Sequence, residues 1–250
     1  MSKILQRVIN FSGGKTSAFM TIHEYREGDI VLFCDTGREH QKTYKFIHDF
    51  EAHEQIPVTW INYDGYFDGF LAKNNYRRIP NRMKRICTVE LKVNTAKRYL
   101  KSIGIIRFEN LIGFRADEPK RVEGRIEHFK KVVTRFPLYE QGIDKQMINE
   151  YWKNKPYTLE IPSILGNCTL CFMKGVNAIS SILTIYPELA EPWINDEKQS
   201  EKQFGHTYFP GVTIEQIRDR AQNNLFKDLP EYVEFQLSQM QPSLTCACTT

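Results

Sequence analysis

The chain has 250 residues, of which 41% are hydrophobic and 26% are charged, and its formal net charge is +4 at pH 7. This composition is sufficient to bury one substantial core, or one core with a small appendage. No apolar run approaches the roughly 18 residues that span a bilayer, and the first residues lack the apolar stretch of a secretory signal. We therefore expect a soluble cytoplasmic protein without a membrane partner.

Strand and helix patterns alternate through the N-terminal part of the chain. Strands are predicted at 7–11, 30–34, 58–63, 111–114 and 132–134, and helices at 17–25, 40–53, 66–74 and 89–102. Strands separated by helical patterns imply right-handed crossovers and a mostly parallel sheet covered on both faces. The expected fold class is α/β with a doubly wound sheet, in which ligands bind at the carboxyl ends of the strands.

The pattern changes to helices and loops from residue 142. Helices are predicted there at 144–153, 174–186, 192–203 and 213–224. We expect an α/β domain at 1–141, a helical part at 142–237 that packs on the same core, and a tail at 238–250. The tail is mostly polar, with Leu244 and two cysteines among its few other residues, and we expect it to be flexible.

A glycine-rich loop, FSGGKTS at 11–17, joins the first predicted strand to the first predicted helix. Paired glycines let the backbone approach a phosphate, while the amides of the helix N-terminus, a lysine and hydroxyl groups supply positive charge and hydrogen bonds. The spacing is not that of a Walker loop. The residues expected to bind the anion are Ser12, Gly13, Gly14, Lys15, Thr16 and Ser17.

A second element, Asp35-Thr36-Gly37, ends the next predicted strand and is followed by Thr43 and Tyr44. The glycine-rich loop resembles the pyrophosphate loop (SGGKxS) of the adenine nucleotide alpha hydrolases, and the second element resembles that of the phosphoadenosine phosphosulfate (PAPS) reductase branch of this superfamily. The resemblance implies that Asp35, Thr36 and Gly37 also bind an adenine nucleotide. Asp35 would hold the ribose or a magnesium ion, and an aspartate that caps a helix is the alternative.

Gly113, Phe114 and Arg115 resemble the G-x-R element of the same family, near the nucleotide. The resemblance implies that Gly113 lies at the nucleotide and that Arg115 and Arg121 face phosphate or sulfate oxygens, which suit a planar guanidinium. Surface arginines of a loop are the alternative.

The Gly-Lys pair of the loop is typical of the ATP-using members of the superfamily. Lys15 would neutralise the pyrophosphate that leaves in an adenylation step. Thr16 stands where the superfamily commonly has an aspartate, which departs from the pattern.

The chain has six cysteines, which in a reducing cytosol favour metal or redox chemistry over disulfides. They are Cys34, Cys87, Cys168, Cys171, Cys246 and Cys248. Cys34 lies within an apolar strand pattern and is interpreted as a small core residue.

Cys168 and Cys171 form a CxxC pair in the order of elements that the family shows. In the cluster-bearing reductases, this pair binds a [4Fe-4S] cluster together with an upstream Cys-Cys pair. Here the upstream pair is Cys87-Thr88, so the resemblance implies metal ligation by Cys87, Cys168 and Cys171 with one iron open to sulfide. Cys246 or Cys248 would close the cluster if it folded back, and zinc on the same cysteines is the alternative.

A block of basic residues lies between residues 77 and 101, with nine Lys or Arg and a single acid, Glu90, which gives nine minus one, or +8. Such a block indicates a polyanionic partner, either the phosphates of the nucleotide or a nucleic acid such as a tRNA or DNA acceptor. A solvated helix face is the alternative.

The favoured function is sulfur transfer linked to adenylation by ATP and Mg²⁺, with Lys15, Asp35 and Arg115 as catalytic residues and a sulfur donor as partner. The first alternative is reduction of APS or PAPS to sulfite, in which Cys248 is the nucleophile and a thioredoxin-type protein is the reductant. The residues around Cys248 do not match the tail of the reductases. A nucleotide-binding module without catalysis is a further alternative, and an oligomer is compatible with the sequence.

Overall fold

The computed structural model describes residues 5–123 and 132–224 of the chain. Within them, the central sheet contains β1 (Gln6–Asn10), β2 (Ile30–Asp35), β3 (Thr59–Asn62), β4 (Phe108–Leu111) and β5 (Val132–Arg135). The strand order is β3-β2-β1-β4-β5, and every pair of neighbours is parallel. This is a doubly wound α/β sheet, so the predicted fold class is confirmed.

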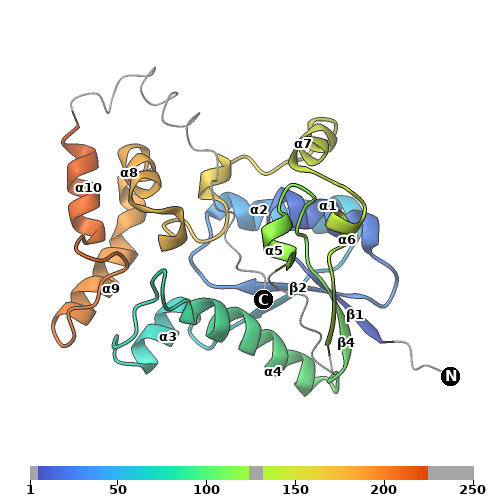
Figure 1. Cartoon of the computed structure of the whole chain (residues 1–250), viewed down its shortest axis with the longest axis horizontal. Helices are drawn as coiled ribbons and strands as arrows, with labels where there is room; N and C mark the ends of the chain where they lie inside the picture. The colour runs from blue at the N-terminus through green and yellow to red at the C-terminus, as the bar shows by residue number, and fades with distance from the viewer. Residues whose placement is uncertain (1–4, 124–131, 225–250) are drawn as a thin grey trace.

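Helices cover both faces of the sheet (Figure 1). On one face lie α1 (Lys15–Glu24), α2 (Gln41–Glu54), α6 (Pro137–Glu140) and α7 (Lys145–Lys153). On the opposite face lie α3 (Tyr66–Lys73) and α4 (Thr95–Ser102), and the short α5 (Pro119–Glu123) follows β4.

Alternate residues of the inner strands pack on opposite faces, as the two-residue period of a strand requires. In β1, Ile9 belongs to the core cluster that contains the buried residues of α1 and α2, whereas Val8 belongs to the cluster under α4. In β2, Phe33 packs with the first cluster and Leu32 with the second. The continuous apolar runs that predicted these strands are therefore the mark of a sheet buried on both sides.

Two predicted elements differ from the structure. The strand predicted at 111–114 is β4, Phe108–Leu111, because the prediction followed the apolar run LIGF, whereas the chain after Leu111 turns through a hydrogen bond from Phe114 N to Ile112 O. The helix predicted at 89–102 is a π-helix, Thr88–Asn94, followed by α4. A π-helical turn has one residue more than an α-helical turn, and such turns are frequent at functional sites.

The C-terminal helices α8 (Val176–Ile185), α9 (Glu191–Glu201) and α10 (Ile214–Gln222) lie to one side of the sheet (Figure 1). Their buried residues share one core cluster with Phe67, Phe70 and Leu71 of α3. Short 3₁₀ turns, Ser163–Leu165, Phe172–Lys174 and Pro187–Ala190, connect this region. None of the described helices combines the length and the apolar character needed to cross a membrane.

The predicted boundary between residues 141 and 142 stays a prediction. After this boundary, Ile148 and Trp152 of α7 pack in the same core cluster as α1 and α2. The indole Nε1 of Trp152 also donates a hydrogen bond to the backbone oxygen of Lys15, at 3.0 Å. The predicted tail at 238–250 lies outside the described residues.

Arg38, in the loop between β2 and α2, connects the sheet to α3 and α9. It is buried, and its Nη2 donates to Asp196 Oδ2 of α9 at 2.9 Å and also pairs with Asp68 of α3. Its guanidinium lies over the rings of Phe67 and Trp193, with Cζ 5.0 Å and 5.2 Å from the centroids. The charge of Asp196 is thus neutralised inside the core.

We predict that Arg38→Ala lowers the free energy of unfolding by about 3–5 kcal/mol, because the buried carboxylate of Asp196 would lose its cation. Lys198→Ala is the matched control, since Lys198 pairs with Glu215 at 2.7 Å on the exposed side of α9, and its loss should stay below about 1 kcal/mol. Urea denaturation measures both values. Equal losses in the two variants would contradict the structural role given to Arg38.

Candidate functional site

The loop at 11–17 joins β1 to the N-terminus of α1. Gly13 has a φ of +72°, and a Cβ atom there would lie 2.8 Å from Cγ2 of Thr43, so the position requires glycine. Ser17 Oγ accepts a hydrogen bond from Ser12 N at 3.0 Å and donates one to Gly14 O at 2.9 Å. Gly14 at the N-cap has no side chain that would compete for the first amides of the helix.

Lys15 is the first residue of α1 and is half-buried. Burial lowers the pKa of its amine. Thr16 follows it, also half-buried. The structure therefore holds a cation, a helix N-terminus and hydroxyl-bearing residues in one short loop, which is the composition of an anion site.

The loop after β2 presents Asp35, Thr36 and Gly37 at the carboxyl edge of the sheet. Asp35 Oδ1 accepts hydrogen bonds from Gly37 N and from the hydroxyl of Tyr44, both at 2.8 Å. Thr36 Oγ1 donates to Glu39 Oε1 at 2.8 Å. Glu39 is buried, with 6% of its surface exposed, and burial raises the pKa of its carboxyl group, against the opposing effect of Lys92.

Gly113 follows β4 and lies against α1. A Cβ atom on Gly113 would be 3.7 Å from Cα of Ser17 and 3.6 Å from Sδ of Met20, so the residue is next to the glycine-rich loop. The structure thus brings together the loop at 12–17 and the predicted G-x-R element.

The two predicted anion-binding arginines are paired with carboxylates in this structure. Arg115 Nε donates to Asp117 Oδ1 at 2.8 Å, and Arg115 Nη1 lies 3.5 Å from Glu118 Oε2. Arg121 Nη1 donates to Glu118 Oε1 at 2.5 Å, and its Cζ lies 3.9 Å from the centroid of the Phe114 ring. A phosphate that binds these arginines has to displace the carboxylates or bind to the guanidinium groups alongside them.

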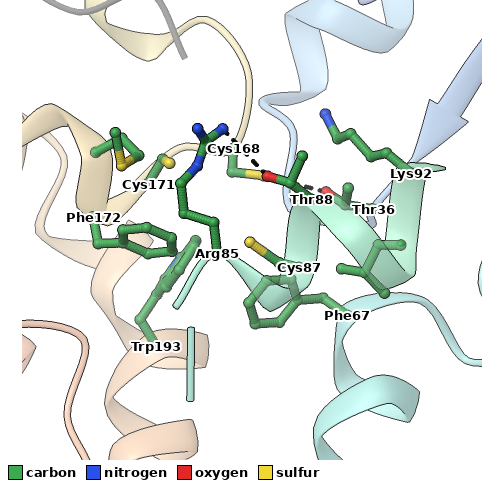
Figure 2. A pocket seen from close by; sticks show the side chains of 12 residues that line it. Thr36, Phe67, Arg85, Cys87, Thr88, Lys92, Cys168, Cys171, Phe172 and Trp193 are labelled. Carbon is green, nitrogen blue, oxygen red and sulfur yellow. Dashed lines mark hydrogen bonds between the residues drawn. The ribbon is translucent and has the colours of Figure 1, made fainter. Parts of the chain in front are cut away.

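Cys87, Cys168 and Cys171 line one pocket between the β2 loop, the π-helix and the C-terminal helices (Figure 2). The other lining residues are Thr36, Phe67, Arg85, Thr88, Leu91, Lys92, Phe172, Met173 and Trp193. Cys168 Sγ is 3.4 Å from Thr36 Oγ1 and 4.0 Å from Glu39 Oε1. The structure therefore brings the three cysteines together in one pocket, and their role as metal ligands stays a prediction.

Backbone pairing fixes the CxxC loop to the loop after β2. Glu39 and Cys168 form an antiparallel bridge, and Thr169 N donates to Arg38 O at 2.9 Å. Lys174 Nζ donates to the backbone oxygens of Cys168 and Thr169, at 2.7 Å and 2.8 Å. The position of the Cys168 thiol is thus set by main-chain contacts.

Several buried titratable groups lie in and beside the pocket. Burial raises the pKa of Cys87 to about 11 and that of Cys168 to about 12, and it lowers the pKa of Lys174 to about 8. Burial also acts to lower the pKa of Lys92, but the neighbouring Cys168 and Glu39 raise it. Lys92 and Lys174, which lie near the thiols, would compensate the negative charge of thiolates.

No group of three or more His, Cys, Asp or Glu among residues 5–123 and 132–224 is arranged to hold a metal ion. The three thiols share a pocket, but they do not converge on a single-ion site. Cys34 is half-buried beside the core under α4, with its Sγ 3.8 Å from Lys92 O, and it does not line this pocket. Cys246 and Cys248, the expected fourth ligand or nucleophile, lie outside the described residues.

Sequence reasoning missed Glu39 and Lys174. Glu39 lies two residues after the Asp35-Thr36-Gly37 element, and this closeness to a predicted binding element was the signal that could have identified it. Lys174 follows the CxxC pair, but its contacts with carbonyl oxygens leave no pattern in the sequence.

A glycine-rich loop and two further loops that meet at the carboxyl edge of a parallel sheet define an α/β protein with the architecture of a nucleotide-binding site. The model of the phosphoadenosine phosphosulfate reductase domain family matches residues 6–158, which is more than half of the chain. The chain belongs to this family, and membership suggests a nucleotide-binding pyrophosphate-loop fold and an enzyme of this family.

Two relatives are similar to this chain. The chain is 31% identical over 201 residues to the uncharacterized nin region protein ORF290 of Escherichia phage lambda, covering 69% of this chain and 67% of that protein. It is 24% identical over 202 residues to the uncharacterized protein MJ0066 of Methanocaldococcus jannaschii, covering 75% of this chain and 40% of the archaeal protein. The match therefore spans less than half of the archaeal relative.

We predict that Cys87 and Cys168 react slowly with iodoacetamide in folded protein freed of metal by a chelator. Their raised pKa values reduce the thiolate fraction at pH 8 by roughly a hundredfold or more relative to an ordinary thiol. Peptide mass spectrometry of alkylation in buffer and in urea measures this, and the rate in buffer should still be rising at pH 10. A rate that levels off near pH 9 would be the opposite result.

Proposed function

We propose that the protein binds ATP with Mg²⁺ and catalyses sulfur transfer linked to adenylation of an acceptor. The observation that supports this proposal most is that residues 35–39 lie between the glycine-rich loop and the cysteine pocket. Asp35 is the last residue of β2, which pairs with β1, the strand that leads into the glycine-rich loop, while Thr36 and Glu39 contact Cys168. A nucleotide and a sulfur-bearing group would therefore be held by adjacent residues of one loop.

In the first step, the loop at 12–17 would bind the phosphates of ATP through its backbone amides, Ser12, Thr16 and Ser17. An oxygen of the acceptor attacks the α-phosphorus, the bond to the bridging oxygen breaks, and pyrophosphate leaves. Lys15 would neutralise the leaving pyrophosphate, and Asp35 would hold the ribose or the magnesium ion. Arg115 and Arg121 would contact the remaining phosphate oxygens from the side of Gly113.

In the second step, a sulfur nucleophile from a donor attacks the activated carbon of the acceptor, and AMP leaves with the acceptor oxygen. Cys87, Cys168 and Cys171 would hold a [4Fe-4S] cluster, whose irons each take one thiolate, because the three thiols line one pocket with Lys92 and Lys174 beside them. A cluster with three protein ligands, when bound, supplies an open iron that can carry the sulfur. Glu39 and Thr36 would fix the orientation of Cys168.

The family match favours a second candidate, the reduction of APS or PAPS to sulfite. In this reaction the thiolate of Cys248 would attack the sulfonate sulfur, and the bond from that sulfur to the phosphate oxygen would break, so that AMP or adenosine bisphosphate leaves. A thioredoxin-type dithiol would then cleave the bond between Cys248 and the sulfonate, release sulfite and become a disulfide. The Gly-Lys pair of the loop favours a triphosphate instead, since a sulfonucleotide has no leaving pyrophosphate.

We predict that Lys15→Ala weakens ATP binding by tenfold or more, because the loop loses its only full positive charge on the phosphates. The melting temperature should change little, since the side chain lies at the N-terminus of α1 and not in the core. Isothermal titration and thermal unfolding measure the two effects. The control is Lys42→Ala, which changes an exposed lysine of α2. Equal ATP affinity in the two variants would mean that the glycine-rich loop is only a structural turn.

We predict that protein prepared without oxygen contains about four irons per chain with matching sulfide. Cys168→Ser should lower the iron content strongly, whereas Cys34→Ser should not, because Cys34 does not line the pocket. Elemental analysis of the three proteins tests this. One zinc per chain and no iron would reject the cluster while leaving the fold unaffected.

A further inference from the structure

The segment at 73–107 carries much of the basic charge of the chain. It contains eleven Lys or Arg and one acid, Glu90, so its formal charge is eleven minus one, or +10. The whole chain has a charge of +4, so the remaining residues carry +4 minus +10, or −6. The protein is therefore strongly polarised, with the positive charge concentrated in the end of α3, the following loop and α4.

Nine of these basic residues form an exposed set that we call the basic surface. They are Lys73, Arg77, Arg78, Arg82, Lys84, Lys97, Arg98, Lys101 and Arg107. None of the nine forms a salt bridge with a residue in the described part of the chain. By contrast, four exposed lysines elsewhere pair with acids, namely Lys42, Lys45, Lys153 and Lys198. Within the described residues, the basic surface thus lacks compensation by acids.

The basic surface also presents aromatic and apolar side chains. The Tyr63 ring brings α3 and α4 together, with Lys73 Nζ 5.9 Å and Arg98 Cζ 5.5 Å from its centroid. Met83 is 92% exposed between two basic residues, and Tyr66 is 42% exposed at the start of α3. Cations interleaved with exposed rings and apolar groups are typical of surfaces that bind single-stranded nucleic acids.

The same segment forms a wall of the cysteine pocket. Arg85, Cys87, Thr88 and Lys92 line the pocket, and the π-helix that contains two of them leads directly into α4. Figure 2 shows Arg85 and Cys87 extending toward the side of the pocket where Cys168 and Cys171 lie. A polyanion on the basic surface would therefore lie next to the thiols.

ATP alone does not account for this surface. The nucleotide phosphates are expected at the loop at 12–17, after β1, and one triphosphate is too small to contact nine exposed cations spread over α3, α4 and the loop between them. A chain of phosphodiesters has a charge at every nucleotide and can contact many cations at once.

We propose that the basic surface binds the backbone of a single-stranded nucleic acid and presents one of its nucleotides to the cysteine pocket; the second part rests on the proposed function. A nucleotide stacked inside a duplex cannot turn its base toward a pocket of buried side chains, whereas an unpaired nucleotide can. The phosphates supply affinity through the cations, and the exposed ring of Tyr66 accepts a stacked base.

The test compares two variants that remove equal charge. The first carries Arg78→Gln, Arg82→Gln, Lys84→Gln and Lys97→Gln on the basic surface. The control carries Lys42→Gln, Lys45→Gln, Lys153→Gln and Lys198→Gln, at the exposed lysines that are paired. Fluorescence anisotropy with single-stranded and duplex oligonucleotides at several salt concentrations measures affinity.

The first variant should bind single strands tenfold or more weakly than the wild type, and the salt slope should fall by about 0.7 for each phosphate that the variant no longer neutralises. The control should stay within about twofold of the wild type, because its charges are already compensated. Three results would each overturn the proposal. The two variants could lose the same affinity, or the wild type could bind duplexes as tightly as single strands. The first variant could also lose as much affinity for anionic phospholipid vesicles as it loses for single strands.

ATP titration separates this inference from the proposed function. The surface variant should bind ATP as the wild type does, while Lys15→Ala should lose ATP binding and retain oligonucleotide binding. If no ATP binds to any protein but the surface variant loses oligonucleotide affinity, the docking surface stands and the proposed function fails. Loss of ATP binding in the surface variant would overturn the separation of the two sites.

Discussion

The loop that follows β2 is the constraint on which the candidate site depends. Three of its residues have different surroundings. Asp35 accepts hydrogen bonds from Gly37 and Tyr44, and Arg38 enters the core between α3 and α9. Glu39 is buried beside Cys168. Because Arg38 is neutralised by Asp196 in the core, the loop has little freedom to move without exposing a buried ion pair. The distance between the expected nucleotide and the thiols is therefore set by this loop, which is held in place by the contacts of Asp35, Arg38 and Glu39.

The topology of the sheet explains why distant sequence elements meet at this loop. Since all strands are parallel, their carboxyl ends lie at one edge, and the strand order changes direction at β1, between β2 and β4. Ligands of doubly wound sheets bind at such a switch point. The loop at 12–17 follows β1 and Gly113 follows β4, and the close approach of Gly113 to Ser17 is the consequence.

Much of the sheet could be predicted from the sequence, because strands buried on both faces appear as apolar runs and the glycine-rich loop marks the first crossover. The error at β4 arose because the apolar run continues past the strand into a turn that is also buried, as Ile112 and Phe114 are. The π-helix after Cys87 has no distinct period in a short segment. Its sequence pattern therefore predicted part of one α-helix.

The cysteines of the site could be predicted as a group because family resemblance supplied their order along the chain. The contacts that hold them could not, since the bridge between Glu39 and Cys168 joins residues 129 positions apart, and the lysine that fixes the CxxC loop binds carbonyl oxygens, which every residue has.

The central claim is that the site uses ATP as an adenylating agent, and the products from competing nucleotides test it most directly. Anaerobic protein is incubated with Mg²⁺ and either ATP or PAPS, in the presence of sulfide, a thiol reductant and single-stranded oligonucleotides, and the products are separated by chromatography. We expect AMP and pyrophosphate from ATP, with sulfur incorporated into the oligonucleotide, and no sulfite from PAPS. Sulfite and adenosine bisphosphate from PAPS, with ATP left intact, would contradict it.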